Sequence, residues 1–288
     1  MESAERLTEI DLTHTAPGWR RLRRDPSFLV ATLGIVLLAS IAIAPGLWGA
    51  GDPFDCTLDR SLIGPSLGHP FGFDLQGCDY YTRVLHGARS SLTVAVLVVS
   101  LISVISVLIG SAIGFKRGIW DTLVGQLGDV VLAMPLILAA AFVLTFFEGR
   151  GVGHVVFALV VLGWPPMTLL VRAQVRSIRR AEFVSAALAL GADRFRLLTK
   201  HILPNAMWAL VVFATTYTAV AVTAEALLTF LGVGLDLPAI SWGLMLAQAR
   251  FRSIDNPHLL IPAVFLALTV ACFVLVGEAI RRAFDPGE

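Results

Sequence analysis

Residues 171–205 read VRAQVRSIRRAEFVSAALALGADRFRLLTKHILPN and form the longest polar interruption in the second half of a very apolar chain. The stretch carries seven cations and two acids, and long uncharged runs lie on both sides of it. The cations are Arg172, Arg176, Arg179, Arg180, Arg194, Arg196 and Lys200, and the acids are Glu182 and Asp193. This pattern predicts a basic, partly helical loop between two membrane spans.

Two short helices that meet at a glycine are predicted within this loop. Nothing from Arg172 to Leu190 breaks a helix, and good helix formers dominate there. Apolar residues recur at three- and four-residue steps and form one stripe. Gly191 follows in the position of a helix C-terminal glycine, and a second short helix can run from there to Pro204. Small residues beside the joint would let the surface of a partner approach the backbone closely.

The composition indicates a polytopic membrane protein. Of the 288 residues, 56% are apolar and only 15% are charged, whereas ordinary globular domains carry about 25% charged residues. A span needs about 20 apolar residues, so the chain has room for six spans. They are expected at residues 28–48, 90–115, 120–147, 154–171, 204–224 and 258–277.

This reading divides the chain into an N-terminal segment (1–25), a first transmembrane helix (26–50), a polar loop (51–89) and a five-helix core (90–282) that contains the basic loop 172–203. A cleaved signal peptide is the alternative for the first apolar run, because the sequence Ala42-Ile43-Ala44 resembles a cleavage site. Against it, the polar lead is long and the run is long enough to span.

The distribution of cations predicts the orientation. With the basic loop and both termini on one side, that side holds 16 Lys and Arg residues and the other side holds 6. Cytoplasmic segments carry the excess of Lys and Arg. Both termini and the basic loop are therefore expected in the cytoplasm, and residues 51–89 outside it.

The segment EFVSAALALG at residues 182–191, followed by HILPN at 201–205, resembles the EAA loop in permease subunits of bacterial ABC importers. In that family the loop docks into a groove on a cytoplasmic ATPase and transmits its motion to the membrane helices. The usual pattern has Glu before the two alanines, where this chain has Ser185. The resemblance assigns ATPase coupling to the following residues: Glu182, Ser185, Ala186, Ala187, Gly191 and Pro204.

A second segment is similar to the C-type permease subunit of dipeptide, oligopeptide and nickel importers. It reads HPFGFDLQGCD at residues 69–79 and GARSSL at 87–92, with Cys78 where the family pattern has Arg. The resemblance implies an all-α type I permease fold with six transmembrane helices in the bacterial inner membrane. It also implies a second homologous permease, two ATP-binding subunits that hold ATP and Mg, and an extracytoplasmic substrate-binding protein. No cofactor is expected on this chain.

The function implied is ATP-driven import of di- or oligopeptides. The residues do not distinguish these from nickel chelates or other solutes. The alternative is an ATP-independent secondary carrier or channel; a carrier would need ion-coupling residues at mid-membrane, where charged groups are scarce. A membrane scaffold is a third possibility. No GxxxxGK[ST], HExxH or GxSxG motif and no Cys/His set with metal spacing occurs, so no enzyme activity is expected.

Cys56 and Cys78 lie in the same predicted outer loop. Disulfides persist in the oxidising space outside the cytoplasmic membrane, so we expect these two residues to form one, in compensation for the missing Arg. Two free thiols are the alternative, and a zinc site with His69 is a remote one because the spacing fits no standard pattern. Cys272 lies in an apolar run and is expected to be an inert core residue.

Asp129 lies about two turns inside the cytoplasmic end of the third predicted span, which makes it a functional candidate by default. The favoured alternative places it at the interface, paired with Lys116, Arg117 or a partner subunit. Pro135 is expected to bend the same helix. Prolines 165 and 166 lie near the end of the fourth span, where they either loosen the helix or are simply tolerated.

Glu225 and Trp242 are candidates for the outer mouth of a translocation pathway, since their segments are similar to the family's AEA and SWG motifs. Glu225 lies about 32 Å along a helix that starts at Pro204, which places it near the outer surface. The alternatives are an ion pair between Glu225 and Arg250 or Arg252, and an interfacial anchor role for Trp242.

Overall fold

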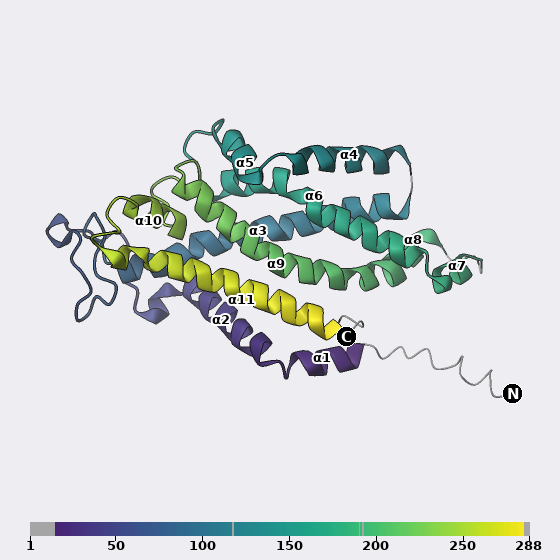
Figure 1. The fold of residues 1–288 in the computed structure, drawn as a ribbon, viewed down its shortest axis with the longest axis horizontal. Helices are drawn as coiled ribbons and strands as arrows, with labels where there is room; N and C mark the ends of the chain where they lie inside the picture. The colour runs from purple at the N-terminus through teal and green to yellow at the C-terminus, as the bar shows by residue number, and fades with distance from the viewer. Residues whose placement is uncertain (1–14, 117, 190, 192, 285–288) are drawn as a thin grey trace.

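The computed structural model describes residues 15–116, 118–189, 191 and 193–284, and it is built from helices (Figure 1). The α-helices are α1 (Thr15–Leu22), α2 (Pro26–Ile43), α3 (Tyr80–Phe115), α4 (Ile119–Ala133), α5 (Leu136–Leu144), α6 (Val152–Arg179), α7 (Glu182–Ala189), α8 (Arg194–Leu197), α9 (Leu203–Phe230), α10 (Trp242–Ala249) and α11 (Ile261–Phe284). A π-helical turn, Leu198–Ile202, joins α8 to α9. Among the described residues, five helical segments are long and apolar enough to cross a membrane, or six if the bent pair α4–α5 is one span.

The long helices run side by side, so the molecule has two polar ends (Figure 1). Helices α7 and α8 lie at one end, which we call the α7 end. The loop between α2 and α3 lies at the opposite end together with α10, and we call this the loop end. The polar segments of the sequence are thereby sorted into two groups that the apolar helices separate.

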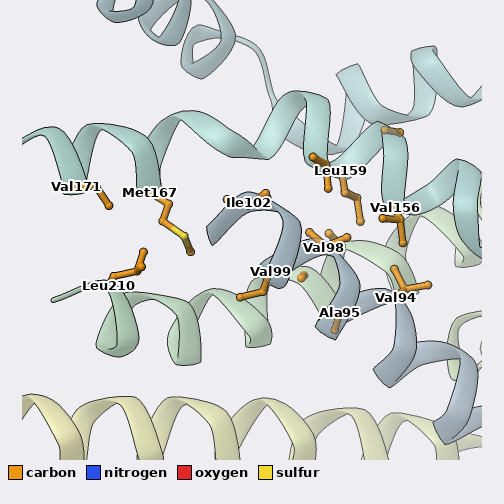
Figure 2. Packing of buried hydrophobic residues seen from close by; sticks show 14 of the residues in the cluster. Val94, Ala95, Val98, Val99, Ile102, Val156, Leu159, Met167, Val171 and Leu210 are labelled. Atoms are coloured by element: carbon orange, nitrogen blue, oxygen red, sulfur yellow. The ribbon is translucent and has the colours of Figure 1, made fainter. Parts of the chain in front are cut away.

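The core forms where α3, α6 and α9 cross. Figure 2 shows Val98 and Ile102 of α3 facing Leu159 of α6, and all three are at most 2% exposed. Glycines allow the close approach of α3 to α6: a Cβ atom on Gly110 would lie 2.7 Å from the carbonyl oxygen of Thr168, and one on Gly114 would lie 2.9 Å from that of Arg172. Neither position has room for a side chain.

The second span starts ten residues earlier than predicted. Helix α3 begins at Tyr80 instead of residue 90, so the segment 87–92 is helical and does not belong to the outer loop. The reason is a local cap: the carboxylate of Asp79 accepts a hydrogen bond from the backbone N–H of Thr82 at 3.1 Å. An acceptor at this position satisfies one of the free N–H groups of a helix start.

The first span is shorter than predicted. Helix α2 covers Pro26–Ile43, capped by Asp25, whose side chain accepts from the N–H of Ser27 at 2.8 Å. A separate 3₁₀ turn, Pro45–Trp48, follows.

The bend in the third span is confirmed. Helices α4 and α5 meet at 91°, and Pro135 stands at the start of α5. The fourth span is longer than predicted, since α6 covers 28 residues and continues through Pro165 and Pro166. The residues from Arg172 to Arg179 thus belong to a spanning helix and not to a loop.

The predicted continuous helix from Arg172 to Leu190 is wrong. Helix α6 ends at Arg179, and α7 starts at Glu182. The backbone N–H groups of Arg180 and Ala181 bond to carbonyls three residues back, which tightens the last turn. The turn brings Val184 into the core, where it is fully buried. Residue 190 lies outside the described residues.

The fifth span opens as predicted, with Pro204 in the first turn of α9. This span is longer than predicted, since α9 continues to Phe230 instead of ending at residue 224. Helix α10 follows as a short helix, and α11 forms the sixth predicted span.

We predict that Gly110→Ala destabilises the protein by about 1–3 kcal/mol, the usual cost of overpacking. The added methyl group would press on the backbone of α6. The measurement is thermal unfolding in detergent. Gly153→Ala is the matched control, because nothing lies within 4 Å of its added Cβ. Equal melting temperatures for the Gly110 and Gly153 variants would contradict a tight crossing.

Candidate functional site

The segment from Glu182 to Leu198, which we call the knob, packs against the core with one side and exposes the other side. Val184 and Leu197 are at most 2% exposed and belong to the main core. On the outer side, Phe183 is 50% exposed and Phe195 is 73% exposed. An apolar outer surface on a firmly anchored element is typical of a docking site.

The structure places the predicted coupling residues together in and beside the knob. Glu182 and Ala186 lie exposed on α7, and Ala187 is half-buried against the core. Ser185 belongs to α7, but its side chain lies outside the described residues. Pro204 is exposed at the start of α9.

Gly191 has the backbone conformation that the sequence predicts. Its φ angle is +83°, in the left-handed region that glycine adopts without a steric cost. Such a residue ends a helix and reverses the chain. The turn between α7 and α8 therefore depends on glycine at this position.

Three of the predicted loop cations fasten α6 to its neighbours. The Nε atom of Arg172 lies 2.5 Å from Oδ1 of Asp121 on α4, and Arg176 pairs with the other carboxylate oxygen. Arg179 donates to the carbonyl oxygen of Phe115 at the end of α3. Sequence analysis missed Asp121. Two arginines four residues apart share one helix face and are a signal for such an acid.

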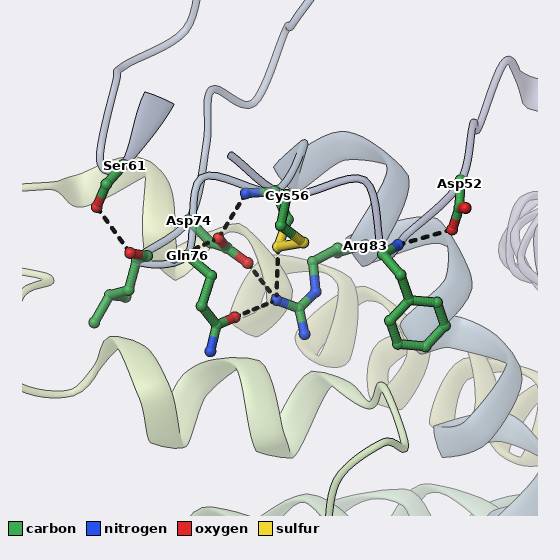
Figure 3. The surroundings of a disulfide bond; sticks show 9 residues. Asp52, Cys56, Ser61, Asp74, Gln76 and Arg83 are labelled. Atoms are coloured by element: carbon green, nitrogen blue, oxygen red, sulfur yellow. Dashed lines mark hydrogen bonds and ion pairs between the residues drawn. A yellow bond between two sulfur atoms is a disulfide. The ribbon is translucent and has the colours of Figure 1, made fainter. Parts of the chain in front are cut away.

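At the loop end, a disulfide joins Cys56 to Cys78, which is the pairing expected from the sequence. Figure 3 shows Arg83 beside this bond and between Asp74 and Gln76. Arg83 pairs with Asp74, and both side chains are 5% exposed. Asp74 also accepts from the N–H of Cys78 at 2.9 Å. Nδ1 of His69 lies 3.1 Å from Oδ1 of Asp79, and among the described residues no metal-ligand set of His69 with Cys56 and Cys78 occurs.

The loops that follow α5 and α9 are joined by Arg150 and Asp236 at 3.0 Å. Hydrogen bonds from the Arg150 side chain and backbone lower the pKa of Asp236. A lowered pKa in the folded state stabilises the fold while the carboxyl group is ionised. This contribution is lost as the pH falls through the lowered pKa.

Glu225 and Trp242 are both fully buried, so neither is exposed at an outer mouth of this chain. Thr229 donates to Oε1 of Glu225 at 3.0 Å, and the hydroxyl groups of Ser91 and Ser241 face the same carboxyl group. The alternative ion pair of Glu225 with Arg250 or Arg252 is not among the described contacts.

The Trp242 indole N–H donates to the carbonyl oxygen of Val84 at 3.0 Å. It therefore holds α10 against α3 and is not an interfacial anchor. A role for Glu225 or Trp242 in the pathway stays a prediction.

Asp129 lies exposed on α4. In the described part of the chain, no ion pair joins it to Lys116, and Arg117 lies outside that part. Its predicted pairing with a partner subunit is not tested by a single chain. No group of three potential metal ligands occurs among the described residues.

Comparison with known proteins gives consistent matches along the chain. A family model described as binding-protein-dependent transport system inner membrane component matches residues 106–288. The dipeptide transport system permease protein DppC of Bacillus subtilis (strain 168) is 32% identical over 286 residues, which cover 98% of this chain and 89% of the relative. The glutathione transport system permease protein GsiD of Shigella sonnei (strain Ss046) is 36% identical over 282 residues, covering 93% and 89%.

We predict that the bond between Cys56 and Cys78 is present in the protein isolated from membranes. Alkylation of the denatured protein should modify one thiol before reduction and three after it, because the chain has three cysteines. Removing the bond by Cys56→Ser should destabilise the outer loop by about 3 kcal/mol in the chain-entropy model. An unchanged mass after reduction and alkylation would show two free thiols instead.

Proposed function

The chain belongs to the family of binding-protein-dependent transport system inner membrane components, and on this premise we propose that it couples ATP hydrolysis on partner subunits to the import of peptides. As a member of this family it is a multi-pass transmembrane subunit of an ABC importer. The observation that supports coupling is the knob, with its buried inner side and its exposed phenylalanines.

The knob is built to transmit a displacement into the membrane. It follows α6 after only two residues, and α8 continues through the π-helical turn into α9. Val184 and Leu197 also pack in the core that α6 and α9 share. A force on the outer surface of the knob would therefore move two spanning helices together.

The assembly we propose has four further chains. Two ATP-binding subunits, each with ATP and Mg, would dock on this knob and on that of a second, homologous permease. A substrate-binding protein would meet the loop end. This places the α7 end and both termini in the cytoplasm, as the excess of cations there favours. Hydrolysis would take place on the ATPases, and this chain would have no enzyme activity of its own.

Alternating access is the mechanism that this arrangement supports. Closure of the ATPases on ATP would displace both knobs, and the path between the two permeases would open outward. Hydrolysis would then restore the inward-open state. The energy must come from differences between the contacts that the ATPases make in the two states, and these contacts include the exposed surface around Phe183 and Phe195.

Peptides are the substrate class that the relatives favour. The curated relatives are named as permeases for dipeptides and for glutathione, and both match nearly the whole chain. The substrate-binding protein would perform most of the selection. For this chain we therefore assign the substrate only as a di- or oligopeptide.

The test is co-purification of the ATPase from detergent-solubilised membranes. Phe183→Glu should weaken the association about thirtyfold, the effect of losing one aromatic hot spot, and should lower substrate-stimulated ATP hydrolysis. Phe54→Glu is the matched control, since Phe54 is 61% exposed at the loop end. Equal loss in both variants, or no ATPase with the unaltered protein, would contradict the proposal.

A further inference from the structure

A basic hollow lies beside the root of the knob and is used by none of the steps above. Its volume is about 420 Å³, and we call it the arginine hollow. It is lined by Leu169, Arg172, Ala173, Arg176, Ser177 and Arg180. A second hollow of about 230 Å³ adjoins it through Arg176 and Arg180 and is also lined by Arg179. Four arginines, from the last two turns of α6 and the residue after it, therefore line two neighbouring hollows.

Positive charge in this hollow exceeds the negative charge that the described residues supply. Asp121 is the carboxylate that pairs with Arg172 and Arg176. Arg180 is exposed, and its side chain makes no ion pair or hydrogen bond among the described residues. The Nε–H of Arg176 is buried without a hydrogen-bond partner in that part of the chain. Guanidinium donors are thus left over for an anion, and their fork geometry suits a phosphate group.

The surface next to the hollow is apolar. Helix α4 contacts α6 on the side that carries Asp121 and Gly125, where a Cβ atom on Gly125 would lie 3.6 Å from Nη1 of Arg172. The first two residues of α4 are exposed, Ile119 at 68% and Trp120 at 72%. Trp is enriched where a membrane meets water. The arginines of the hollow therefore lie beside the exposed apolar residues at the start of α4.

We propose that the arginine hollow binds the phosphate headgroup of an anionic phospholipid, with the acyl chains lying along the exposed apolar face of α4. A ligand for this place needs both an anionic head and an apolar body, and a phospholipid has both. Inorganic phosphate would use only the arginines. Basic pockets between transmembrane helices are known sites for anionic headgroups. Because Arg180 lies two residues before α7, the bound lipid would stabilise the position of the knob relative to α6.

The test counts lipids on the assembled complex in neutral detergent by native mass spectrometry. The probes are phosphatidylglycerol, phosphatidylcholine with the same acyl chains, and inorganic phosphate. Phosphatidylglycerol should bind the unaltered complex more tightly than phosphatidylcholine. Arg180→Gln should weaken phosphatidylglycerol binding about fivefold, the effect of one cation near a membrane surface, and Arg180→Lys should retain most of it.

Arg21→Gln is the charge-matched control, because Arg21 is exposed on α1, outside the knob, and lines neither hollow. It should bind phosphatidylglycerol like the unaltered complex. Equal binding of the two lipids, equal effects of the Arg180 and Arg21 variants, or full competition by inorganic phosphate would each overturn the proposal. The proposal would also be overturned if the Arg180→Gln complex lost a partner subunit while its lipid binding stayed unchanged. The assay measures no transport, so its outcome is separate from that of the proposed function.

Discussion

The close crossing of α3 and α6 is the constraint on which the rest of the structure depends. Gly110 and Gly114 bring the two helices into backbone contact, and this fixes the direction in which α6 leaves the core. Between helices that lie in lipid, such packing is a main source of association, because the surrounding chains are as apolar as the helices themselves. The position of α6 in turn sets the place of its terminal arginines and of the knob.

Polar contacts then fasten the two ends of the bundle. At the α7 end, Asp121 binds two arginines of α6 and thereby joins α4 to it. At the loop end, the disulfide and the buried pair of Asp74 and Arg83 hold the loop between α2 and α3 on the start of α3. Removing one partner of such a buried pair is strongly destabilising, because it leaves an uncompensated buried charge. The molecule thus has a packed apolar middle, and ion pairs or a disulfide join its segments at each end.

Much of this arrangement could be predicted from the sequence because it depends on local chemistry. The apolar runs predicted the spans, and Pro135 predicted the bend in the third span. Gly191 predicted the chain reversal between α7 and α8. The start of α3 could be predicted only in part. Asp79 is a typical capping residue three positions before Thr82, and this local signal was missed. The burial of Arg83 in the first turn depends on its pairing with Asp74 in the folded loop, which no sequence pattern shows.

The same limit applies to Asp121 and Glu225. Their partners are separated from them by 51 residues or lie on three different segments. The two arginines of α6 indicate that an acid is needed, but no local pattern identifies which acid it is. The break between α6 and α7 is also tertiary in origin, because the burial of Val184 overrides a helix-favouring sequence. Where helix propensity allows more than one helix boundary, long-range pairing and burial determine which boundary forms.

The most direct test of the account is which end of the molecule faces the cytoplasm. Single cysteines can be placed at the exposed positions Phe183 and Leu67 and treated with a membrane-impermeant thiol reagent in right-side-out vesicles. The account predicts that Leu67→Cys is labelled at once and that Phe183→Cys is labelled only after the membrane is permeabilised. Labelling of Phe183→Cys in sealed vesicles, with Leu67→Cys protected, would place the knob outside the cell and contradict coupling to a cytoplasmic ATPase.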